Sequence, residues 1–542
     1  MPEKELPRRP SLEQYKKQAK ELLQESKASS PQALQRFRNH LRPKKLSPKK
    51  LSQSSFSLTN AQLVIAREHG FESWPKFARQ IELLRHQNSA AAQSHPVAVF
   101  ITAACVPRTT SHNSGTLDLA NAILAERSHL ADDSIYTAAI LGDDAAVRGF
   151  LAVNQQDATR KGGPYGWDAL TYLCFSRYLR LDPARSAGFV RAAQALLDAG
   201  ANPSTGWFEN DHQPHPEWES VLYGAAGIAQ HAELTRLLLD RGADPNDGET
   251  PYHVPETYNN AVLRVMLESG KLTPDSLATM LLRKADWHDL EGGKLLLDAG
   301  ADPNRMTRWG YTALHQALRR DNSLEIIEGM LDRGAIVTLK NEQTNQSGFA
   351  MAVRRGRGDV LSAVMRRGIV IGLGPAEPLI VACAMNDLES ICGIVKHAPW
   401  MVDQLREQGG TLLAEFAGNG NTDGVRHLLD LGVDVAAPYK EGDPYYDIAK
   451  GSMALHVAAW RAHPATVRLL IERGAPINQT DSKGRTPLSL AVKACVDSYW
   501  THRRSPESVE ALLRAGASAK DVEHPTGYAE VDELLKKYAK RA

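Results

Sequence analysis

Leu296-Leu297-Asp298-Ala299-Gly300-Ala301-Asp302-Pro303-Asn304 is a phrase that returns along the chain and decides its fold. Earlier copies read Leu238-Leu239-Asp240-Arg241-Gly242-Ala243-Asp244-Pro245-Asn246 and Leu196-Leu197-Asp198-Ala199-Gly200-Ala201-Asn202. Later copies centre on Gly334, Gly432, Gly474 and Gly516, and weaker ones on Gly270 and Gly368. The glycines follow one another at steps of 28 to 42 residues, apart from one step of 64 that splits into 30 and 34 if a degenerate copy lies near Ala398. A repeat of about 33 residues with irregular insertions predicts a solenoid.

Each part of this phrase has a physical role. In the copy that begins at Thr235, the leucines fall on one face of a helix. Gly242 follows as a residue that can adopt the left-handed conformation and end the helix. Asp244-Pro245-Asn246 then favours a turn, because proline cannot continue a helix and Asp and Asn cap turns through their side chains. One such unit cannot bury its own apolar face, so neighbouring units must stack.

A second recurrent phrase opens the other helix of each unit. It reads Gly310-Tyr311-Thr312-Ala313-Leu314-His315 in one copy, Gly484-Arg485-Thr486-Pro487-Leu488-Ser489 in another and Ser452-Met453-Ala454-Leu455-His456 in a third. Threonine suits the N-cap, where its hydroxyl can accept a hydrogen bond from an otherwise unpaired backbone N–H. Pro487 suits the first helical position.

These two phrases closely resemble the ankyrin repeat, whose pattern is G-x-T-P-L-H, two helices and L-L-x-x-G-A-D-x-N. The resemblance spans roughly residues 96–542 and is most specific at 296–334 and 453–516. It implies an all-α solenoid of antiparallel helix pairs with projecting finger loops, in an elongated and curved stack. It also implies binding rather than catalysis.

The expected domains are a basic helical N-terminal domain at 1–86, a linker at 87–95, a repeat array at 96–525 and a C-terminal capping helix within 526–542. The array should hold about eleven or twelve helix pairs. We place them near 97–127, 132–152, 168–199, 220–241, 258–269 (a truncated pair), 274–299, 312–333, 347–367, 378–398, 411–431, 453–473 and 487–515.

The pattern of the N-terminal segment predicts four helices, near 11–27, 31–41, 57–68 and 73–84, with a flexible loop at 42–55. It resembles a small helical domain that precedes ankyrin repeats in some bacterial proteins. The matching stretches begin at Pro10, Ala61 and Gly70. A module that packs against the open end of the solenoid and covers it is the simplest interpretation.

The formal net charge of +1 hides an asymmetry between the two ends of the chain. Residues 1–95 hold 18 Lys and Arg against 8 Asp and Glu, which leaves 46 against 55 for the remainder. The five cysteines are scattered and form no C-x-x-C pair, so buried thiols are expected rather than disulfides or a metal site. The chain shows no leader-like or membrane-spanning apolar run, and we expect a cytoplasmic protein.

Aromatic residues are scarce, at 6%, yet they gather in insertions between repeats. The finger-loop insertions are 202–219, 244–258 and 434–452, and longer turns between paired helices are expected at 106–115, 176–188 and 497–506. Exposed aromatic side chains are favoured interface anchors, although each ring could instead pack on its own loop. The predicted partner-binding residues are Trp207, Phe208, Trp218, Tyr252, Tyr258, Tyr439, Tyr445, Tyr446, Tyr499 and Trp500.

Residues that suggest catalysis have simpler interpretations. In the ankyrin pattern the histidine at His315 and His456 is structural and forms a hydrogen bond across the turn between repeats. No Ser, Cys or carboxylate recurs at a fixed offset from either histidine to complete a triad. Asp211, His212 and His215 lie in a loop without a second ligand pair, so we predict neither a metal nor a cofactor.

The strongest signal outside the repeats is a basic patch without an intervening acid, namely Arg36, Arg38, Arg42, Lys44, Lys45, Lys49 and Lys50. Such a cluster can contact phosphates without sequence preference, but no aromatic platform or recognition helix accompanies it. A solvated basic loop, or one that docks on the acidic repeat array, is the favoured interpretation.

The leading hypothesis is a non-enzymatic scaffold that binds another protein with the concave face and finger loops of the array. The alternatives are nucleic-acid or anionic-surface association through the basic patch, and an enzyme with its site in a divergent repeat. A deep pocket with convergent ionisable groups would favour the enzyme.

Overall fold

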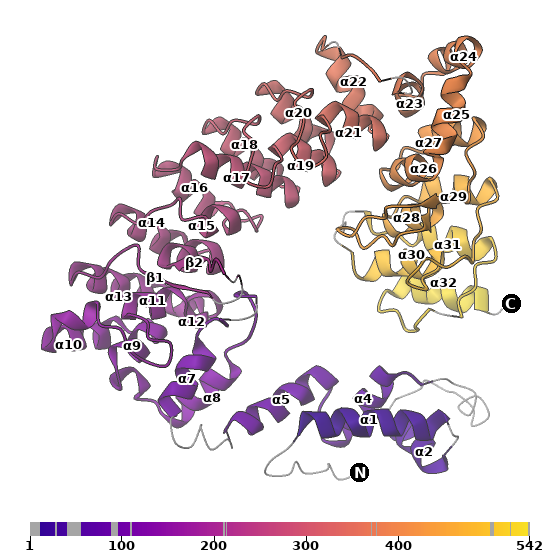
Figure 1. Cartoon of the computed structure of the whole chain (residues 1–542). Coiled ribbons are helices and arrows are strands. Elements are labelled where there is room, and N and C mark those ends of the chain that lie inside the picture. The colour runs from indigo at the N-terminus through magenta and orange to yellow at the C-terminus, as the bar shows by residue number, and fades with distance from the viewer. Residues whose placement is uncertain are drawn as a thin grey trace. The chain divides into compact units, whose positions relative to one another are not determined.

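The computed structural model of the chain describes residues 11–27, 30–40, 56–87, 96–108, 111–209, 212, 214–369, 371–374, 377–498, 503–520 and 522–539. It consists of two compact units. The first unit is Met1–Val254 with Ala261–Leu272, and the second is Pro255–Asn260 with Thr273–Ala542. Helix pairs follow one another side by side within each unit (Figure 1). The all-α ankyrin-type fold predicted from the sequence is therefore confirmed, whereas the predicted domain boundaries stay predictions.

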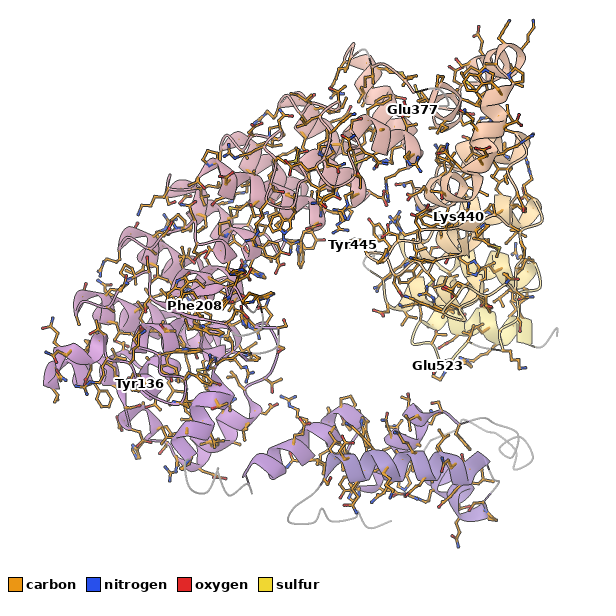
Figure 2. The ribbon with its side chains drawn as sticks, in the orientation of Figure 1. Tyr136, Phe208, Glu377, Lys440, Tyr445 and Glu523 are labelled. Carbon is orange, nitrogen blue, oxygen red and sulfur yellow. The ribbon has the colours of Figure 1, made fainter. Side chains whose placement is uncertain are left out.

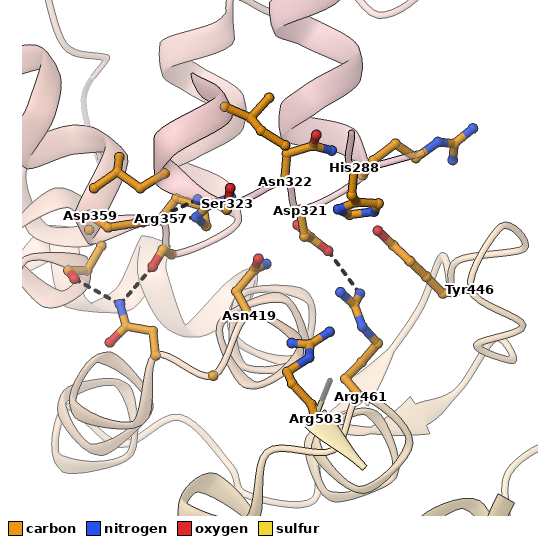
Figure 3. A pocket seen from close by; sticks show the side chains of 18 of the residues that line it. His288, Asp321, Asn322, Ser323, Arg357, Asp359, Asn419, Tyr446, Arg461 and Arg503 are labelled. Atoms are coloured by element: carbon orange, nitrogen blue, oxygen red, sulfur yellow. Dashed lines mark hydrogen bonds and ion pairs between the residues drawn. The ribbon is translucent and has the colours of Figure 1, made fainter. Parts of the chain in front are cut away.

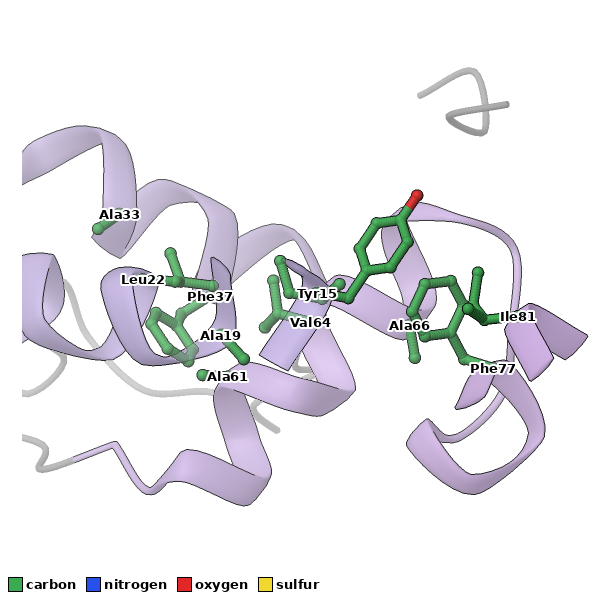
Figure 4. Close-up of a cluster of buried hydrophobic side chains, with 11 residues drawn as sticks. Tyr15, Ala19, Leu22, Ala33, Phe37, Ala61, Val64, Ala66, Phe77 and Ile81 are labelled. Atoms are coloured by element: carbon green, nitrogen blue, oxygen red, sulfur yellow. The ribbon is translucent and has the colours of Figure 1, made fainter. Parts of the chain in front are cut away.

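The first unit begins with four helices, α1 (Leu12–Lys27), α2 (Pro31–His40), α4 (Leu58–Glu68) and α5 (Trp74–Gln87). Their apolar faces meet in one cluster, in which Tyr15, Leu22 and Phe37 are buried (Figure 4). The ring of Phe77 packs edge-on against Tyr15, with centroids 4.9 Å apart. The four helices therefore share one apolar core made of their own residues, and α5 also contacts α8 of the repeats.

The repeats of the first unit follow as helix pairs. Their elements are α7 (Pro96–Ala104), α8 (Asp118–Glu126), α9 (Ile135–Leu141), α10 (Asp144–Val153), α11 (Ala169–Cys174), α12 (Arg177–Leu181), α13 (Ser186–Asp198), the π-helix η4 (Tyr223–Ile228), α14 (Ala232–Asp240), α15 (Glu249–His253) and α16 (Ala261–Glu268). Three short 3₁₀ helices also occur, η1 (Leu130–Asp132), η2 (Gln155–Ala158) and η3 (Pro183–Arg185). Strands β1 (Gly206–Phe208) and β2 (Trp218–Ser220) pair antiparallel, with Trp207 opposite Glu219.

The second unit continues the same pattern. Its helices are α17 (Pro274–Asp286), α18 (Leu290–Asp298), α19 (Ala313–Arg319), α20 (Leu324–Asp332), α21 (Gly348–Arg354), α22 (Gly358–Arg366), α23 (Glu377–Ala384), α24 (Leu388–His397), α25 (Trp400–Glu407), α26 (Gly409–Gly418), α27 (Thr422–Asp430), α28 (Ala454–Trp460), α29 (Pro464–Glu472), α30 (Pro487–Val496), α31 (Glu507–Arg514) and α32 (Ala529–Ala539). Strands β3 (Pro438–Tyr439) and β4 (Ser452–Met453) pair antiparallel.

The glycine of the repeated phrase ends its helix as predicted. Gly242, Gly300 and Gly474 have φ angles of 96°, 89° and 83°, in the left-handed region that favours glycine. The asparagine that closes the phrase joins one repeat to the next. The Asn304 side chain donates to the carbonyl oxygen of Gly334 (2.9 Å) and accepts from the amide of Ile336 (2.7 Å). The phrase therefore ends a helix and also sets the spacing between neighbouring repeats.

His315 and His456 hold successive repeats together, so their structural role is confirmed. Nδ1 of His315 lies 2.7 Å from the Thr312 hydroxyl at the start of α19, and Nε2 donates to the carbonyl oxygen of Leu339 (2.9 Å). His456 accepts from the amide of Met453 and donates to the carbonyl oxygen of Gln479 (3.0 Å). Both rings are buried, with 1% of each residue exposed.

These buried histidines predict a loss of stability on mild acidification. Burial lowers the pKa of His315 and of His456 in the folded chain. Since the unfolded chain protonates near pH 6.5, each ring's contribution is complete above that pH. It should fall by up to about 1.4 kcal/mol per pH unit below it, until the folded-state pKa is reached.

Urea denaturation at pH 7.0 and pH 5.0 measures the effect, with His456→Asn as the comparison. The variant should lose less stability between the two pH values than the wild type, because one of the two histidines is gone. An identical loss in both proteins would contradict this role of His456.

Some elements differ from the sequence-based prediction, and the first difference concerns residues 244–258, expected as a projecting loop. They contain helix α15, which begins one residue after Gly248. The predicted truncated pair is therefore a short first helix, α15, followed by α16. Gly248-Glu249-Thr250-Pro251-Tyr252-His253 matches the G-x-T-P-L-H pattern and was the available signal.

One helix and two short ladders were not predicted. Helix α25 is an extra helix between two pairs, and it contacts α23, α24 and α26. It begins after Pro399 and buries Val402 and Leu405 on one face. The insertions at 202–219 and 434–452 each contain a short antiparallel ladder, β1 with β2 and β3 with β4.

Candidate functional site

The second unit contains a cleft of about 1380 Å³ that is lined by turns between paired helices. Five consecutive pairs, from α17/α18 to α26/α27, each contribute a turn residue with positive φ: His288 (53°), Asp321 (49°), Gly356 (65°), Asn386 (58°) and Gly420 (72°). A left-handed residue lets the chain reverse direction in a short turn. The five turns lie along the same side of the stack of helix pairs. The loop between β3 and β4 and the residues Arg461 and Arg503 complete the lining (Figure 3).

Two sets of contacts draw these turns together. Nδ2 of Asn421 donates to the carbonyl oxygens of Gly356 (2.7 Å) and Ala384 (2.8 Å), so one amide joins three turns. Nη1 of Arg461 donates to Asp321 over 2.9 Å, although 140 positions separate the two residues in the sequence. The stack therefore curls on its turn side, and the curl encloses the cleft.

Asp321 is the centre of a buried ion-pair network at the wall of the cleft. Only 5% of its side chain is exposed, and Arg355 donates to both carboxylate oxygens over 2.8 Å. Burial alone would raise the pKa of Asp321, but the charges of Arg355 and Arg461 outweigh burial and hold that pKa well below its usual range. Asp321 is therefore ionised throughout the physiological pH range.

A second carboxylate supports the network from behind the wall. Nη1 of Arg355 lies 3.1 Å from Glu415, and the hydroxyl of Tyr439 donates to the other oxygen of Glu415 over 2.6 Å. Burial raises the pKa of Tyr439, and Glu415 adds to the effect, so the phenol keeps its proton. We predicted Tyr439 as a partner-binding residue, but the structure buries it at 5% exposure, where its hydroxyl is committed to Glu415.

Three of the predicted aromatic residues line the cleft. Tyr446 is buried, and the guanidinium of Arg461 lies 3.8 Å from the centroid of its ring. Tyr445 holds the guanidinium of Arg320 against its ring and remains 45% exposed. Tyr258 is 65% exposed, with its ring edge-on to Trp287 at 5.8 Å. Tyr446 is therefore part of the wall, whereas Tyr258 and Tyr445 present exposed rings.

The other predicted rings belong to the first unit or lie outside the described residues. Trp207 is buried against Trp167 and Phe175, which flank helix α11, so its ring packs on the preceding repeat and is not exposed to a partner. Phe208 is labelled in Figure 2. Its side chain is 56% exposed, and its ring packs edge-on against the half-buried Trp218. The remaining predicted residues are the half-buried Tyr252 of α15, and Tyr499 and Trp500, which lie outside the described residues.

The basic patch can be placed only in part. Arg36 makes two hydrogen bonds, of 2.7 Å and 3.0 Å, to Glu68 of α4, so this arginine has an internal carboxylate partner. The Arg38 side chain and the residues Arg42, Lys44, Lys45, Lys49 and Lys50 lie outside the described part of the chain. Association with nucleic acid or an anionic surface stays a prediction.

The described residues also bear on chemistry of other kinds. Burial raises the pKa of Cys383 to about 12 and that of Cys495 to about 11, so neither thiol is a nucleophile at neutral pH. Within the described ranges, no three His, Cys, Asp or Glu residues are grouped as metal ligands. No described helix combines the length and the apolar character that crossing a bilayer requires.

Sequence reasoning missed the charged wall of the cleft around Asp321 and Arg461, which look like ordinary polar positions near the end of a helix. Arg503 lies in the insertion at 497–506, which the sequence predicted as a longer turn, but its place in the wall of a cleft was not predicted. The only available signal was the non-glycine residue at the turn between paired helices, where a glycine would be expected.

Comparison with known protein families supports the repeat assignment. Models described as "Ankyrin repeats (3 copies)" match residues 379–481 and 436–523, and a model described as "Ankyrin repeats (many copies)" matches residues 281–331. All of the matched residues lie in the second unit, which also holds the cleft.

Several curated proteins are similar to part of this chain. They include the ankyrin repeat and KH domain-containing protein mask-1 of Caenorhabditis elegans, 26% identical over 47% of this chain and 9% of that protein. The B-cell lymphoma 3 protein homolog of Mus musculus is 25% identical over 40% of this chain and 52% of that protein. Diacylglycerol kinase iota of Mus musculus is 35% identical over 16% of this chain and 9% of that protein. The matched segments thus span from about a tenth to about half of these relatives.

Proposed function

Because this chain contains ankyrin repeats, which generally mediate protein–protein interaction, we propose that it is a non-enzymatic scaffold that binds an extended segment of a partner protein. The cleft does bring ionisable groups together, which is the feature that would favour an enzyme, but Asp321 is committed to ion pairs with Arg355 and Arg461, and this supports binding over catalysis. The cleft of the second unit is the binding site. The observation that carries the proposal is the alignment of five helix-pair turns along one cleft of about 1380 Å³. Because each repeat contributes one turn, the row of turns forms a groove in which an extended chain can lie along the stack.

The walls of the cleft are rigid before any partner arrives. Arg355, Arg461 and Asp321 are fixed by mutual ion pairs, and Asn421 holds two carbonyl groups. A preorganised site loses little conformational entropy when it binds, so more of the contact energy contributes to affinity. Tyr258 and Tyr445 are the exposed anchors of this site, since aromatic rings bury a large area with few rotatable bonds.

The proposal predicts that Tyr258→Ala and Tyr445→Ala weaken partner binding by about tenfold each, which corresponds to about 1.4 kcal/mol. Affinity capture from the source cell, with quantification of each captured protein, measures the change. Trp400→Ala is the matched control, because Trp400 is 47% exposed in the same unit and does not line the cleft. Partners captured equally by all four proteins would contradict the proposal.

A further inference from the structure

We propose that the wall around Asp321 recognises one anionic oxygen group, a carboxylate or a phosphate, on the partner segment. This inference rests on the proposed function and names the chemistry of the ligand. The residues that would receive the anion are Arg357, Arg461 and Arg503, all of which line the cleft. Figure 3 shows Arg461 facing Asp321, with Arg503 and Tyr446 alongside.

The wall around Asp321 has more hydrogen-bond donors than acceptors. A guanidinium has five N–H donors and no acceptor. Both oxygens of Asp321 already accept from Arg355, and one of them also accepts from Arg461. Asp321 therefore has little accepting capacity left, and an incoming oxygen group would add acceptors to a wall that is rich in donors.

Arg357 is a buried cation with one donor that is unsatisfied within the described part of the chain. Its side chain is 7% exposed, and Nε and Nη2 donate to Asp359 over 2.9 Å and 2.8 Å. Among the described residues, the buried Nη1 atom of Arg357 has no hydrogen-bond partner. A buried charged donor without an acceptor is unfavourable, so an acceptor from a ligand would remove a cost that the free protein carries.

The environment of Arg503 also favours an anion. Burial, followed by the charge of Arg461, lowers the pKa of Arg503 to about 10. One polar side chain beside it is His463, whose Nε2 lies 3.1 Å from Nη1 of Arg503, and burial lowers the pKa of that imidazole to about 3. His463 is therefore neutral at physiological pH and leaves the charge of Arg503 to be balanced by carboxylates. A ligand anion would make the positive form of Arg503 more favourable.

The rim of the cleft limits how acidic the ligand can be. Asp423 and Asp359 are 57% and 40% exposed at the edge, and Glu256 and Asp286 lie at the other end beside Arg283. A ligand with charge at every position, such as a nucleic acid, would meet these carboxylates. A single anion flanked by apolar or aromatic residues avoids them and places a side chain against Tyr258 or Tyr445. The geometry thus points to a protein segment.

A peptide selection tests the inference on the full-length chain. A random 12-residue peptide library is selected on immobilised wild-type protein, and an enriched peptide is then made with a fluorescein label for anisotropy titration. Each Asp or Glu is changed in turn to its amide, and the C-terminal carboxylate to a carboxamide. One of these changes should weaken binding by about 10- to 100-fold, since a charge-assisted hydrogen bond to a buried arginine is lost.

The receiving side is tested with Arg503→Gln and Arg357→Lys. Each variant should reduce affinity at least tenfold for the acidic peptide and little for its amide form. The loss from the arginine substitution and the loss from the amide substitution should therefore not be additive. Arg468→Gln is the matched control, because Arg468 is 49% exposed on α29 and does not line the cleft. Hydrogen exchange over α21 and α28 checks that each variant keeps the wall folded.

The remaining arms identify the source of the anion and separate the two proposals. Tighter binding of the same peptide with phosphoserine at the sensitive position would assign a phosphate, and weaker binding would assign a carboxylate. Peptides that depend on Tyr445 but show no acid preference would overturn the anion site and leave the scaffold standing. Enrichment of no peptide, or displacement of the peptide by a single-stranded oligonucleotide at lower concentration, would overturn both.

Discussion

Asp321→Asn should lower the free energy of unfolding of the second unit by about 3–5 kcal/mol, because the change leaves buried guanidinium groups without their anion. Arg355 and Arg461 would face a neutral amide, and an amide has one oxygen where the carboxylate has two. The backbone should tolerate the change. Asp321 has a φ of 49°, and Asn adopts the left-handed region as readily as Asp does. The substitution therefore isolates the charge.

Hydrogen–deuterium exchange over α19, α21 and α28 measures the loss where it should occur, since these helices flank the network. Asp332→Asn is the matched control, because Asp332 also pairs with an arginine of the next repeat, Arg367, but is 63% exposed. That change should cost less than about 1 kcal/mol. Equal effects of the two substitutions would show that burial of the pair is unimportant.

The contribution of the Asp321 ion pairs to stability also depends on pH. The pKa of Asp321 is lower in the folded chain than in the unfolded chain, so its contribution to stability is complete above about pH 4. It is lost as the pH falls below that value. The wild type should therefore lose more stability than Asp321→Asn on strong acidification. This loss comes on top of the loss that the buried histidines cause in both proteins.

Local features of the repeat could be predicted because they are encoded locally. Gly300 ends a helix for reasons that depend only on its own backbone, and His315 bonds within its own repeat and to the next turn. Such contacts span at most about one repeat, so they recur with the sequence pattern. The pattern therefore predicted the helix pairs, their ends and the role of the histidines.

The cleft could not be predicted, because it depends on contacts between repeats that are far apart. Nothing in the residues around Arg461 indicates that its partner is Asp321, 140 positions earlier. Tyr439 and Tyr446 have the same residue type as Tyr445 and lie in the same insertion, yet two are buried and one is exposed. Which ring stays exposed depends on Glu415 and Arg461, and therefore on the tertiary fold.

The curl that encloses the cleft also depends on close packing at one glycine. Gly356 occupies the turn between α21 and α22 with a φ of 65°. A Cβ atom at this position would lie 2.4 Å from ring atoms of Phe416, which belongs to α26 two pairs further on. No other residue type allows the turn and that ring to approach each other so closely.

Gly356→Ala should therefore destabilise the second unit by about 2–5 kcal/mol. Left-handed backbone in a residue with a Cβ costs about 1–2 kcal/mol, and overpacking against a buried ring adds about 1–3 kcal/mol. Hydrogen exchange over α21 and α26 measures the sum. The same variant should weaken binding of the acidic peptide, because the displaced turn carries Arg357 with it.

Two further variants separate the backbone effect from the steric effect. Gly334 has a φ of 85°, and a Cβ atom there would meet no neighbouring atom within 4 Å, so Gly334→Ala should cost only the backbone part. Phe416→Leu removes the obstructing ring, and in combination with Gly356→Ala it should recover part of the loss. The double-mutant cycle then gives the coupling between the turn and α26. A coupling near zero would mean that Gly356 is needed only for its backbone conformation, and that the close approach of Phe416 does not maintain the curl.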